Sequence, residues 1–558
     1  MTTTKPLRFV IIGGVAAGAS AAARARRHSE SASITLIERG PDVSFANCGL
    51  PYFIGGEITS RAALAVQTPQ TLHALLNLEV RTSTEAIAVD REGKRVQLRS
   101  LAAGTTEWLP YDKLLLAPGA VPVRPPLPGI DDPRIFTLRS LQDMDRIKAA
   151  AAHAQKVAVI GAGFIGLEMA EQFVRLGKHV TLVELLDQVL PPLDRPMTLL
   201  LEDALRRHGV QLHLGDGIAS FETEEQLLAC RLNSGATVPA DLVVLSIGVR
   251  PDSELARAAG LNLGSRGHIV VNPFMQTSAP DIYAAGDAVE IEDFVSGLPT
   301  TVALGGPANR QGRLVADHIF APEKTKPYPG ALGTAIVRVF DVAAGLTGWS
   351  EKRLRAAGRA YRTVTVNDNN HASYFPGAKP LILKLLWDPA NGAVLGGAIA
   401  GDAGVDKRLD VLATAITGGL TIDDLAELEL AYAPPFGAAK DIVNLAGFVA
   451  TNLRAGLVNT DEELPADPMV QVLDVRPTAL AAAHPVPHAG VINIPLGELR
   501  RRSSELDRTR PVLTVCALGK TAYFASRVLT QRGFTVRSLN GGLRGRYDPR
   551  SPAKLPTP

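Results

Sequence analysis

Short apolar runs separated by glycine-rich turns recur along the first half of the chain. Residues 7–12 form one run and residues 34–37 another, with an alanine-rich helical stretch between them. The same order returns later, over residues 157–160, 167–176 and 180–183. A strand, a glycine turn, a helix and a second strand that ends in an acid make a βαβ unit. The pattern therefore predicts two Rossmann-like dinucleotide-binding domains.

The apolar pattern continues beyond these units. Further strands are expected near residues 113–117, 241–248 and 282–285, and mixed strands and helices follow from about residue 325. Residues 452–467 are polar and unpatterned, which is typical of a linker, and a compact α/β segment comes after them. The predicted fold class is α/β, with domains at 1–120 plus 250–325, at 121–249, at 326–451 and at 468–547, a linker at 452–467 and a tail at 548–558.

Composition narrows the functional classes. A chain of 558 residues is too long for one core, and a net charge of +2 favours neither a nucleic-acid surface nor an acidic tail. No apolar run approaches the ~20 residues that span a bilayer. The three cysteines, Cys48, Cys230 and Cys516, fit neither a disulfide framework nor a zinc site. We expect a cytoplasmic protein with small-molecule ligands and no nucleic-acid, membrane or metal partner.

The second glycine turn has a complete dinucleotide fingerprint. Gly161, Gly163 and Gly166 follow the strand in the spacing that lets a backbone approach a pyrophosphate. Glu184 comes 18 residues after Gly166, at the end of the next strand. Its carboxylate can accept hydrogen bonds from a ribose 2′-hydroxyl and would repel a 2′-phosphate. Leu185 follows, with no arginine to bind such a phosphate, so NADH is favoured over NADPH.

The first glycine turn departs from the fingerprint, because Val15 replaces its middle glycine. An acid at the end of the second strand and a late Gly-Asp loop support a dinucleotide site even so. Together these features resemble the glutathione-reductase-like pyridine nucleotide–disulfide oxidoreductases, over about residues 7–450. The resemblance implies FAD in the first unit, a nicotinamide cofactor in the second and a dimerisation domain over 326–451. The residues it assigns to FAD are Gly13, Gly14, Gly18, Glu38, Gly119, Gly286 and Asp287.

Cys48 has no second cysteine near it. The reductases of this family that carry both redox thiols have a C-x-x-x-x-C pair, which is absent here. The His-Pro of the glutathione reductase type occurs only at 484–485, in the C-terminal segment. Single-cysteine NADH peroxidases and oxidases carry a histidine where this chain has Ala16. A lone thiol implies that its disulfide partner comes from the substrate.

Three further runs resemble the coenzyme A disulfide reductase branch of the family. They are S-F-A-N-C at 44–48, H-x-x-Y-F-P-G at 371–377 and Y-A-P-P at 432–435. The resemblance implies a homodimer in which Tyr374 and Tyr432 reach the partner subunit's catalytic cysteine and stabilise or protonate the leaving sulfur. It also implies contacts to coenzyme A from Ser20, Arg24, Arg27, Ser44, Asn47 and Lys440, while a lysine expected in the seventies is missing.

Simpler interpretations exist for these residues. Cys48 alone could be a structural cysteine, the two tyrosines could be interface aromatics, and Arg24 and Arg27 could form a solvated helix face. Cys230 lies in an apolar strand and is interpreted as a small core residue. For Cys48 to act as a nucleophile it needs a lowered pKa, which we expect from a flavin above it and from helix-end amides.

The C-terminal segment adds a second sulfur site. Residues 513–515 form a strand that runs into Cys516-Ala517-Leu518-Gly519-Lys520-Thr521 and a helix. A cysteine in such a loop has backbone amides around its sulfur, which stabilises a thiolate or a persulfide. The segment 468–547 resembles a rhodanese domain, whose loop reads C-x-x-G-x-[TR]. The usual glutamate after 474–476 is absent and the motif at 487–491 is degraded, but Asn-Gly-Gly at 540–542 is intact.

The fusion predicts a function. The two sulfur sites resemble those of NADH-dependent persulfide and polysulfide reductases, in which coenzyme A carries the sulfur. We expect an NAD(P)H-driven flavoprotein in which Cys48 reduces coenzyme A persulfide or disulfide and Cys516 accepts sulfur. Three alternatives stay open: a plain coenzyme A disulfide reductase, an NADH oxidase or peroxidase, and a redox sensor or sulfur carrier without enzymatic activity.

Overall fold

The computed structural model describes residues 5–548 and residue 550. The chain forms two compact units. The first runs through residue 187 and resumes over 209–333, and the second contains residues 188–208 and the described residues from 334 onward. Within the described residues, no helix has both the length and the hydropathy that crossing a bilayer requires.

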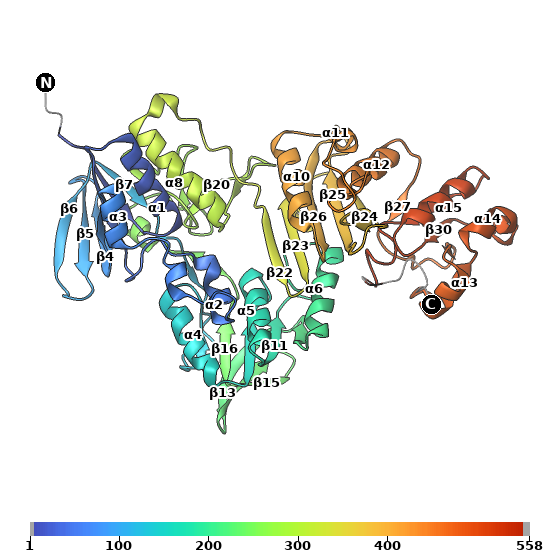
Figure 1. The fold of residues 1–558 in the computed structure, drawn as a ribbon, viewed down its shortest axis with the longest axis horizontal. Coiled ribbons are helices and arrows are strands. Elements are labelled where there is room, and N and C mark those ends of the chain that lie inside the picture. Colours follow the sequence, from blue (N-terminus) through green and yellow to red (C-terminus); the bar gives the residue numbers. More distant parts are fainter. Residues whose placement is uncertain (1–4, 549, 551–558) are drawn as a thin grey trace. The chain divides into compact units, whose positions relative to one another are not determined.

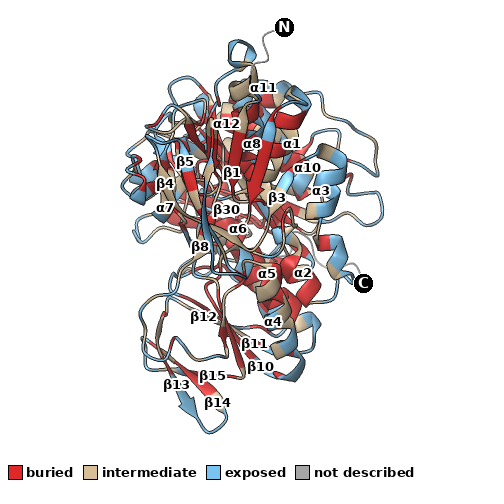
Figure 2. Cartoon of the chain, turned by 90° about the vertical axis from the view of Figure 1, so that its left-hand side faces the viewer, coloured by how far each residue is buried: buried red, intermediate tan, exposed pale blue. Residues whose placement is uncertain are grey.

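The first unit begins with a parallel sheet in the order β19-β7-β1-β2-β3. The helices α1 and α8 pack against each other beside this sheet (Figure 1). The fully buried Phe9, Ile11 and Leu36 belong to its core, and Figure 2 shows the buried residues of β1 in red. The bounds are β1 Arg8–Ile12, α1 Ala16–His28, β2 Ser33–Ile37, β3 Glu79–Arg81, β7 Lys113–Leu116, β19 Ile282–Ala284 and α8 Gly305–Phe320.

Shorter elements complete this domain. An antiparallel sheet lies in the order β4-β5-β6, β18-β20-β21 form another small sheet, and β8 pairs with β17. Their bounds are η1 Asn47–Gly49, α2 Leu50–Ile54, η2 Arg61–Leu64, α3 Pro69–Leu76, β4 Thr84–Asp90, β5 Arg95–Ser100, β6 Thr106–Pro110, β8 Ala120–Pro122, β17 Val249–Pro251, α7 Glu254–Ala258, β18 Ile269–Val270, β20 Val289–Glu292, β21 Pro299–Thr300 and η3 Pro322–Lys324.

A second parallel sheet of the first unit has the order β12-β11-β10-β16-β9, next to an antiparallel sheet β13-β14-β15. The strands expected at 157–160, 180–183 and 241–248 are therefore found, in one sheet and in parallel. The bounds are β9 Ile135–Phe136, α4 Leu141–His153, β10 Lys156–Ile160, α5 Phe164–Arg175, β11 His179–Glu184, β12 Gln211–Leu214, β13 Ile218–Glu224, β14 Leu227–Leu232, β15 Thr237–Ala240 and β16 Leu242–Leu245.

The second unit contains an antiparallel sheet in the order β22-β23-β26-β25-β24. Helix α6 (Arg195–Arg207) belongs to this unit and packs on β23 and β26. Residues 188–208, which the predicted domain over 121–249 includes, cluster with the second unit, and Met197, Leu201 and Leu205 of α6 are buried. The other bounds are β22 Ala335–Val339, β23 Val342–Gly348, α9 Glu351–Ala356, β24 Arg362–Asn369, β25 Pro380–Trp387, β26 Val394–Gly401, α10 Val405–Thr417, α11 Ile422–Glu427 and α12 Ile442–Arg454.

The second unit ends with a parallel sheet in the order β27-β31-β30-β28-β29. The expected unpatterned linker at 452–467 is corrected, because α12 extends to Arg454 and β27 pairs with β31. Of the predicted tail, residue 549 and residues 551–558 lie outside the described residues. The bounds are β27 Thr460–Asp461, β28 Gln471–Asp474, α13 Thr478–Ala483, β29 Ile492–Asn493, α14 Leu496–Arg502, η4 Ser503–Glu505, β30 Val512–Val515, α15 Lys520–Thr530 and β31 Val536–Leu539.

Candidate active site

The first glycine turn joins β1 to α1. Gly13 has a φ of +98°, and a side chain there would lie 2.0 Å from the carbonyl oxygen of Ala117, so only glycine fits. A side chain at Gly18 would lie 1.8 Å from the carbonyl oxygen of Gly13. Helix α1 has no side-chain cap. Its first amides therefore remain available to an anion such as a pyrophosphate.

Glu38 follows β2 and turns its carboxylate toward the glycine turn. Its Oε2 accepts a hydrogen bond from the amide of Gly14 at 2.9 Å, and its Oε1 accepts one from the amide of Gly40 at 2.8 Å. A carboxylate has about four acceptor positions, so Glu38 keeps capacity for ribose hydroxyls. The Glu38 side chain thus fits the predicted role of binding a ribose of the dinucleotide.

The loop after β19 places a carboxylate in the same domain. The amide of Gly286 donates to Oε1 of Gln311 at 2.8 Å, which fixes the loop to α8. Burial raises the pKa of Asp287, and the nearby Arg139 opposes this rise. Arg139 also donates to the carbonyl oxygen of Pro118 at 3.1 Å, next to Gly119. A ligand hydroxyl would supply a hydrogen bond to such a desolvated carboxylate.

The second glycine turn joins β10 to α5. A side chain at Gly166 would lie 1.9 Å from the carbonyl oxygen of Gly161, whereas one at Gly163 would meet no protein atom within 4 Å. The protein's own packing therefore does not require glycine at position 163. Glycine there would instead let the pyrophosphate of a dinucleotide approach the backbone. Glu184 accepts hydrogen bonds from the amides of Ala162 at 2.7 Å and Leu186 at 3.0 Å. This turn fits a second dinucleotide.

Cys48 lies in η1, directly before α2, and is exposed. Its Sγ contacts Oδ1 of Asn47 at 3.8 Å, and no described backbone amide donates to it. Protein crowded around the thiol raises its pKa by desolvation, and the charges of Glu168 and Asp287 raise it further. This corrects the expectation that helix-end amides lower it. Any lowering must come from molecules that bind beside Cys48.

Ser20, Arg24 and Arg27, predicted to bind coenzyme A, all lie on α1. Ser20 donates to Oδ1 of Asn309 at 2.6 Å, and Arg24 forms an ion pair with Asp317. Both partners belong to α8, where no sequence motif pointed to them. Arg27 is exposed and has no ion-pair partner among the described residues. Ser44, which has a φ of +49°, and Asn47 lie in the segment that ends at Cys48.

The structure brings the two predicted tyrosines together. The hydroxyl oxygens of Tyr374 and Tyr432 are 3.0 Å apart, and the side chains are 74% and 48% exposed. The hydrogen bond to Tyr432 is the main cause that raises the pKa of Tyr374. Lys440 lies in the same loop as Tyr432 and is exposed.

A buried ion pair holds the two tyrosine loops. Arg408 of α10 and Asp441 are each 3% exposed, and their side chains are 2.7 Å apart. Arg408 also donates to the carbonyl oxygen of Asn370 at 2.6 Å, at the start of the Tyr374 loop. Asp441 ends the Tyr432 loop and accepts from the amide of Val443 at 3.2 Å, capping α12. No motif in the sequence pointed to this pair.

Cys516 directly follows β30 and is 2% exposed. Its Sγ accepts hydrogen bonds from the amides of Gly519 at 3.2 Å and Ala522 at 3.3 Å. Gly519 has a φ of +89°, which turns its amide toward the sulfur. The loop before α15 thus forms the predicted amide cradle, which stabilises a negatively charged sulfur.

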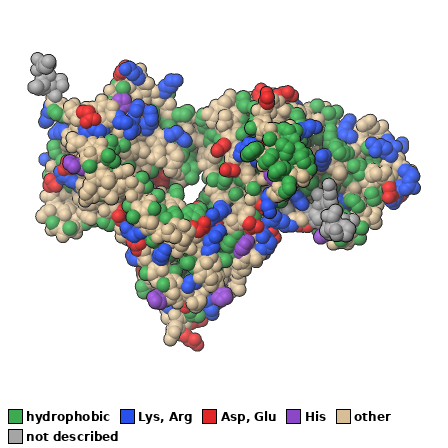
Figure 3. Space-filling model, viewed as in Figure 1, with side chains coloured by type: hydrophobic (Ala, Val, Ile, Leu, Met, Phe, Trp, Pro, Cys, Tyr) green, Lys and Arg blue, Asp and Glu red, His purple; other side chains and the backbone are tan. Residues whose placement is uncertain are grey.

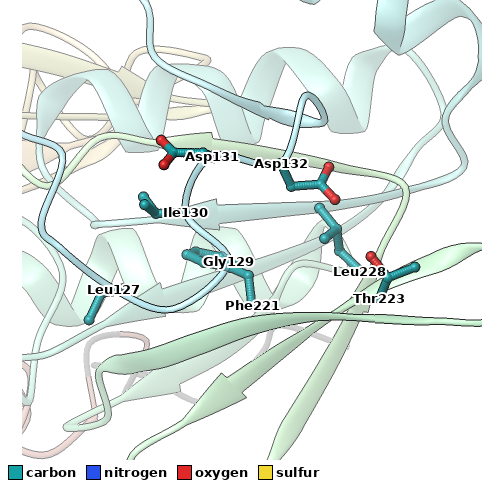
Figure 4. A pocket seen from close by; sticks show the side chains of 8 residues that line it. All are labelled: Leu127, Gly129, Ile130, Asp131, Asp132, Phe221, Thr223 and Leu228. Carbon is teal, nitrogen blue, oxygen red and sulfur yellow. The ribbon is translucent and has the colours of Figure 1, made fainter.

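A pocket of about 300 Å³ lies elsewhere in the first unit (Figure 4). It contains none of the predicted site residues, and Asp132, one of its two acids, is paired with Arg134 at 2.7 Å. Its lining residues are Leu127, Gly129, Ile130, Asp131, Asp132, Phe221, Thr223 and Leu228.

Comparison with known families agrees with the predicted domain types. Residues 7–311 match the pyridine nucleotide-disulphide oxidoreductase family, and residues 334–442 match the dimerisation domain of that family. Residues 460–546 match the rhodanese-like domain, beginning at β27. The chain belongs to the pyridine nucleotide-disulphide oxidoreductases, an FAD- and NAD(H)-dependent family, and carries a rhodanese domain in addition. The predicted fold class is confirmed.

Individual relatives are similar over most of their length. A coenzyme A disulfide reductase of Staphylococcus aureus (strain bovine RF122 / ET3-1) is 34% identical over 445 residues, 79% of this chain and 99% of the relative. The structure of reduced Bacillus anthracis CoADR-RHD has a TM-score of 0.94 and 42% identity, covering 97% of each chain. An NAD-dependent persulfide reductase from A. fulgidus has a TM-score of 0.92 and 38% identity, covering 97% of this chain and 100% of that one.

Proposed function

We propose that this enzyme uses NADH to reduce the sulfur–sulfur bond of coenzyme A persulfide or coenzyme A disulfide. The observation that carries the proposal is that Cys48 is a lone exposed thiol in a disulfide oxidoreductase, and that the same chain holds a second thiol in an amide cradle. A lone thiol needs a partner sulfur from the substrate. The similarity to a coenzyme A disulfide reductase and to a persulfide reductase supports this substrate class.

In the proposed reaction, the thiolate of Cys48 attacks the sulfur–sulfur bond. That bond breaks, a bond from Cys48 to one substrate sulfur forms, and the other sulfur leaves with the electron pair. FAD, held by the first glycine turn with Glu38, and NADH, held by the second with Glu184, would supply the two electrons needed to cleave the new bond. Cys48 returns to a thiolate. With the persulfide, the balance is coenzyme A persulfide, NADH and a proton giving coenzyme A, hydrogen sulfide and NAD⁺.

The second unit would supply the proton donors. Tyr374 and Tyr432 share a hydrogen bond and remain exposed, so we infer a homodimer in which this pair stabilises or protonates the sulfur that leaves in the partner subunit. Figure 3 shows hydrophobic side chains over the region of α12. Phe375 and Phe436, next to the tyrosines, are 38% and 72% exposed. Apolar area of this kind favours association.

Coenzyme A would bind through the exposed residues near Cys48 and α1. Arg24 and Arg27 supply positive charge for phosphates, although Asp317 shares the charge of Arg24. Asn47 contacts the thiol, Ser44 lies four residues before it, and Lys440 would add positive charge from the loop that contains Tyr432. The three free cysteines are compatible with a reducing compartment, so we also infer a cytoplasmic location.

Steady-state oxidation of NADH tests the proposal. The acceptors compared are coenzyme A persulfide, coenzyme A disulfide and oxygen alone. We expect turnover with both sulfur acceptors, fastest with the persulfide, and slow turnover with oxygen. A higher rate with the disulfide than with the persulfide would favour a plain coenzyme A disulfide reductase, and fast oxidation of NADH by oxygen without a sulfur acceptor would favour an NADH oxidase. Absence of turnover with every acceptor would leave only a sensor or carrier role.

Replacing Cys516 with serine should remove sulfur acceptance and leave reduction intact. The serine hydroxyl keeps the shape of the loop, but it has no sulfur and cannot form a persulfide. Transfer of sulfur from thiosulfate to cyanide should fall to background, while NADH-dependent reduction of coenzyme A disulfide stays within about twofold of the wild type. A loss of both activities would contradict separate roles for the two thiols.

Replacing Glu184 with alanine together with Leu185 with arginine should shift the preference from NADH toward NADPH. The change removes a carboxylate that repels a 2′-phosphate, and Leu185, which is 63% exposed, becomes a cation that binds one. We expect kcat/KM for NADH to fall by roughly tenfold to a hundredfold, the loss expected from a charged hydrogen bond. The Leu185→Arg single variant is the control. An unchanged ratio of the two cofactors would refute the role of Glu184.

A further inference from the structure

The edge strand of the antiparallel sheet in the second unit contacts the cysteine loop of the rhodanese domain. Figure 1 shows β24 beside the sheet that contains β27. The amide of Thr365, on the outer edge of β24, donates to Oδ1 of Asn540 at 2.8 Å. Asn540 is 3% exposed and donates through Nδ2 to Glu462 at 2.6 Å. The outer edge of β24 is therefore covered, at this point, by the Asn-Gly-Gly turn.

Asn367, two residues along β24, reaches the loop itself. Its Nδ2 donates to the carbonyl oxygens of Gly541 at 2.8 Å and Leu518 at 3.3 Å. Both partners are acceptors only, so the orientation of the side-chain amide is fixed by its surroundings. One side chain of the dimerisation domain thus binds the cysteine loop and the adjoining turn together.

The carbonyl group of Leu518 belongs to the peptide whose amide binds the sulfur. That peptide joins Leu518 to Gly519, and the amide of Gly519 donates to Sγ of Cys516 at 3.2 Å. A hydrogen bond to a peptide oxygen polarises the peptide and strengthens the donor at its other end. It also prevents the peptide from rotating, because the oxygen and the amide hydrogen point in opposite directions.

The other carbonyl groups of the loop are held within the rhodanese domain. The amides of Leu543 and Arg544 donate to the carbonyl oxygens of Cys516 and Ala517, each at 3.0 Å. Leu518 carries the third of these three successive carbonyl groups. Its carbonyl oxygen accepts its described hydrogen bond from Asn367 of the dimerisation domain. The peptide directly beside the sulfur thus depends on Asn367.

We infer that Asn367 is a positioning residue for sulfur transfer at Cys516, acting through the peptide between Leu518 and Gly519. The inference rests on the proposed role of Cys516 as a sulfur acceptor. Residues of two domains then form the amide cradle together. The rhodanese loop stabilises a thiolate or persulfide of Cys516 fully only when it contacts β24.

A simpler role for Asn367 would be to attach one domain to the other. Another docking contact separates the two roles, because it does not touch the loop. Arg550 binds Asp203 at 3.1 Å and Asp402 at 3.4 Å, which tie the end of the rhodanese domain to α6 and to the loop after β26. Removing Arg550 weakens docking without removing the hydrogen bond to Leu518.

The test compares the variants Asn367→Leu, Asn369→Leu and Arg550→Ala with the wild-type holoenzyme. Leucine has nearly the shape of asparagine and no charge, but it lacks the amide donors. Asn369 lies on the same face of β24, and its side chain makes no hydrogen bond within the described residues, so its variant is the matched control. Asn367→Ala serves as a second variant, and thermal melting identifies any that are unfolded.

The readout is the pH dependence of alkylation by iodoacetamide, followed for each cysteine by peptide mass spectrometry. Cys48 in the same molecules is an internal reference. The charged side chains on the elements around the loop stay in place in Asn367→Leu, so they do not account for a shift. These side chains are Asp368 on β24, Asp474 and Arg476 at the end of β28, Lys520 on α15, and Arg544 and Arg546 after the glycine turn.

We expect the midpoint for alkylation of Cys516 to rise by about one pH unit in both Asn367 variants, so that alkylation at pH values below the midpoint slows about tenfold. Sulfur transfer from thiosulfate to cyanide should lose a similar factor in kcat/KM, with reduction of coenzyme A disulfide unchanged. A midpoint equal to the wild type, or one equally shifted in Arg550→Ala, would overturn the inference. A shifted midpoint in a protein whose wild type transfers no sulfur would support the positioning role and refute the proposed function of Cys516.

Discussion

Replacing Cys48 with serine is expected to abolish NADH-dependent reduction of coenzyme A persulfide and coenzyme A disulfide while FAD remains bound. A serine hydroxyl cannot attack a sulfur–sulfur bond, and no other thiol of the chain lies near Cys48 in the sequence. Loss of an essential nucleophile typically costs a factor of roughly a thousand or more in kcat. The measurement is NADH oxidation with each acceptor, together with the visible flavin spectrum of the variant.

Cys230→Ala is the matched control for this variant. Cys230 is fully buried in β14, and burial raises the pKa of Cys230 to about 12. Such a thiol is inert at neutral pH, so its removal should leave reduction unaffected. Retention of persulfide reduction by Cys48→Ser would show that the proposed mechanism is wrong, provided that the variant binds as much flavin as the wild type.

Replacing Asp441 with alanine should strongly destabilise the dimerisation domain. Arg408 would remain as a buried, unpaired cation, which typically costs about 3–5 kcal/mol in the free energy of unfolding. The cap of α12 and the anchor shared by the two tyrosine loops would be lost with it. Chemical denaturation, followed through the transition of this domain, should show a lower midpoint, and reduction should fall because Tyr374 and Tyr432 are no longer held together.

The pair Asp423–Arg454 provides the comparison. It links α11 and α12 of the same domain, but its side chains are 52% and 40% exposed. Exposed pairs add little to stability, so Asp423→Ala should lower the midpoint far less than Asp441→Ala does. The double variant Arg408→Met with Asp441→Leu should recover much of the loss, because it leaves no buried charge. Equal effects of the two single acid substitutions would show that the buried pair is not the anchor.

Local sequence patterns predicted the strands and glycine turns, because the residues that determine these elements lie within the elements themselves. The strands over 157–160 and 180–183 are confirmed, and Glu38 and Glu184 lie at strand ends beside the glycine turns, because a strand, a turn and a helix are set by neighbours in the sequence. The membership of α6 could not be predicted. Amphipathic periodicity shows that a helix buries one face, but it does not show which sheet receives that face.

The candidate site also contains residues that local motifs predict and residues that they do not. Motifs predicted Cys48, Cys516 and the two tyrosines as site residues, but the groups that hold the loops of these residues come from distant segments without a motif. Arg408 lies 33 residues from Asp441, and Asn367 lies 151 residues from Leu518. The raised pKa of Cys48 was also missed, because it depends on burial and on carboxylates that the fold brings near. Such long-range pairings leave no pattern in a single sequence.

The short strand β27 shows which residues must accompany the rhodanese domain when it is fused to another protein during evolution. It completes one edge of the rhodanese sheet by pairing with β31, yet it lies within the polar stretch at 452–467. A recombination that joined the domains after this stretch would deliver a sheet with an uncovered edge, which invites aggregation. Exchange between genes should therefore favour breakpoints before residue 460, so that strand and domain are inherited together.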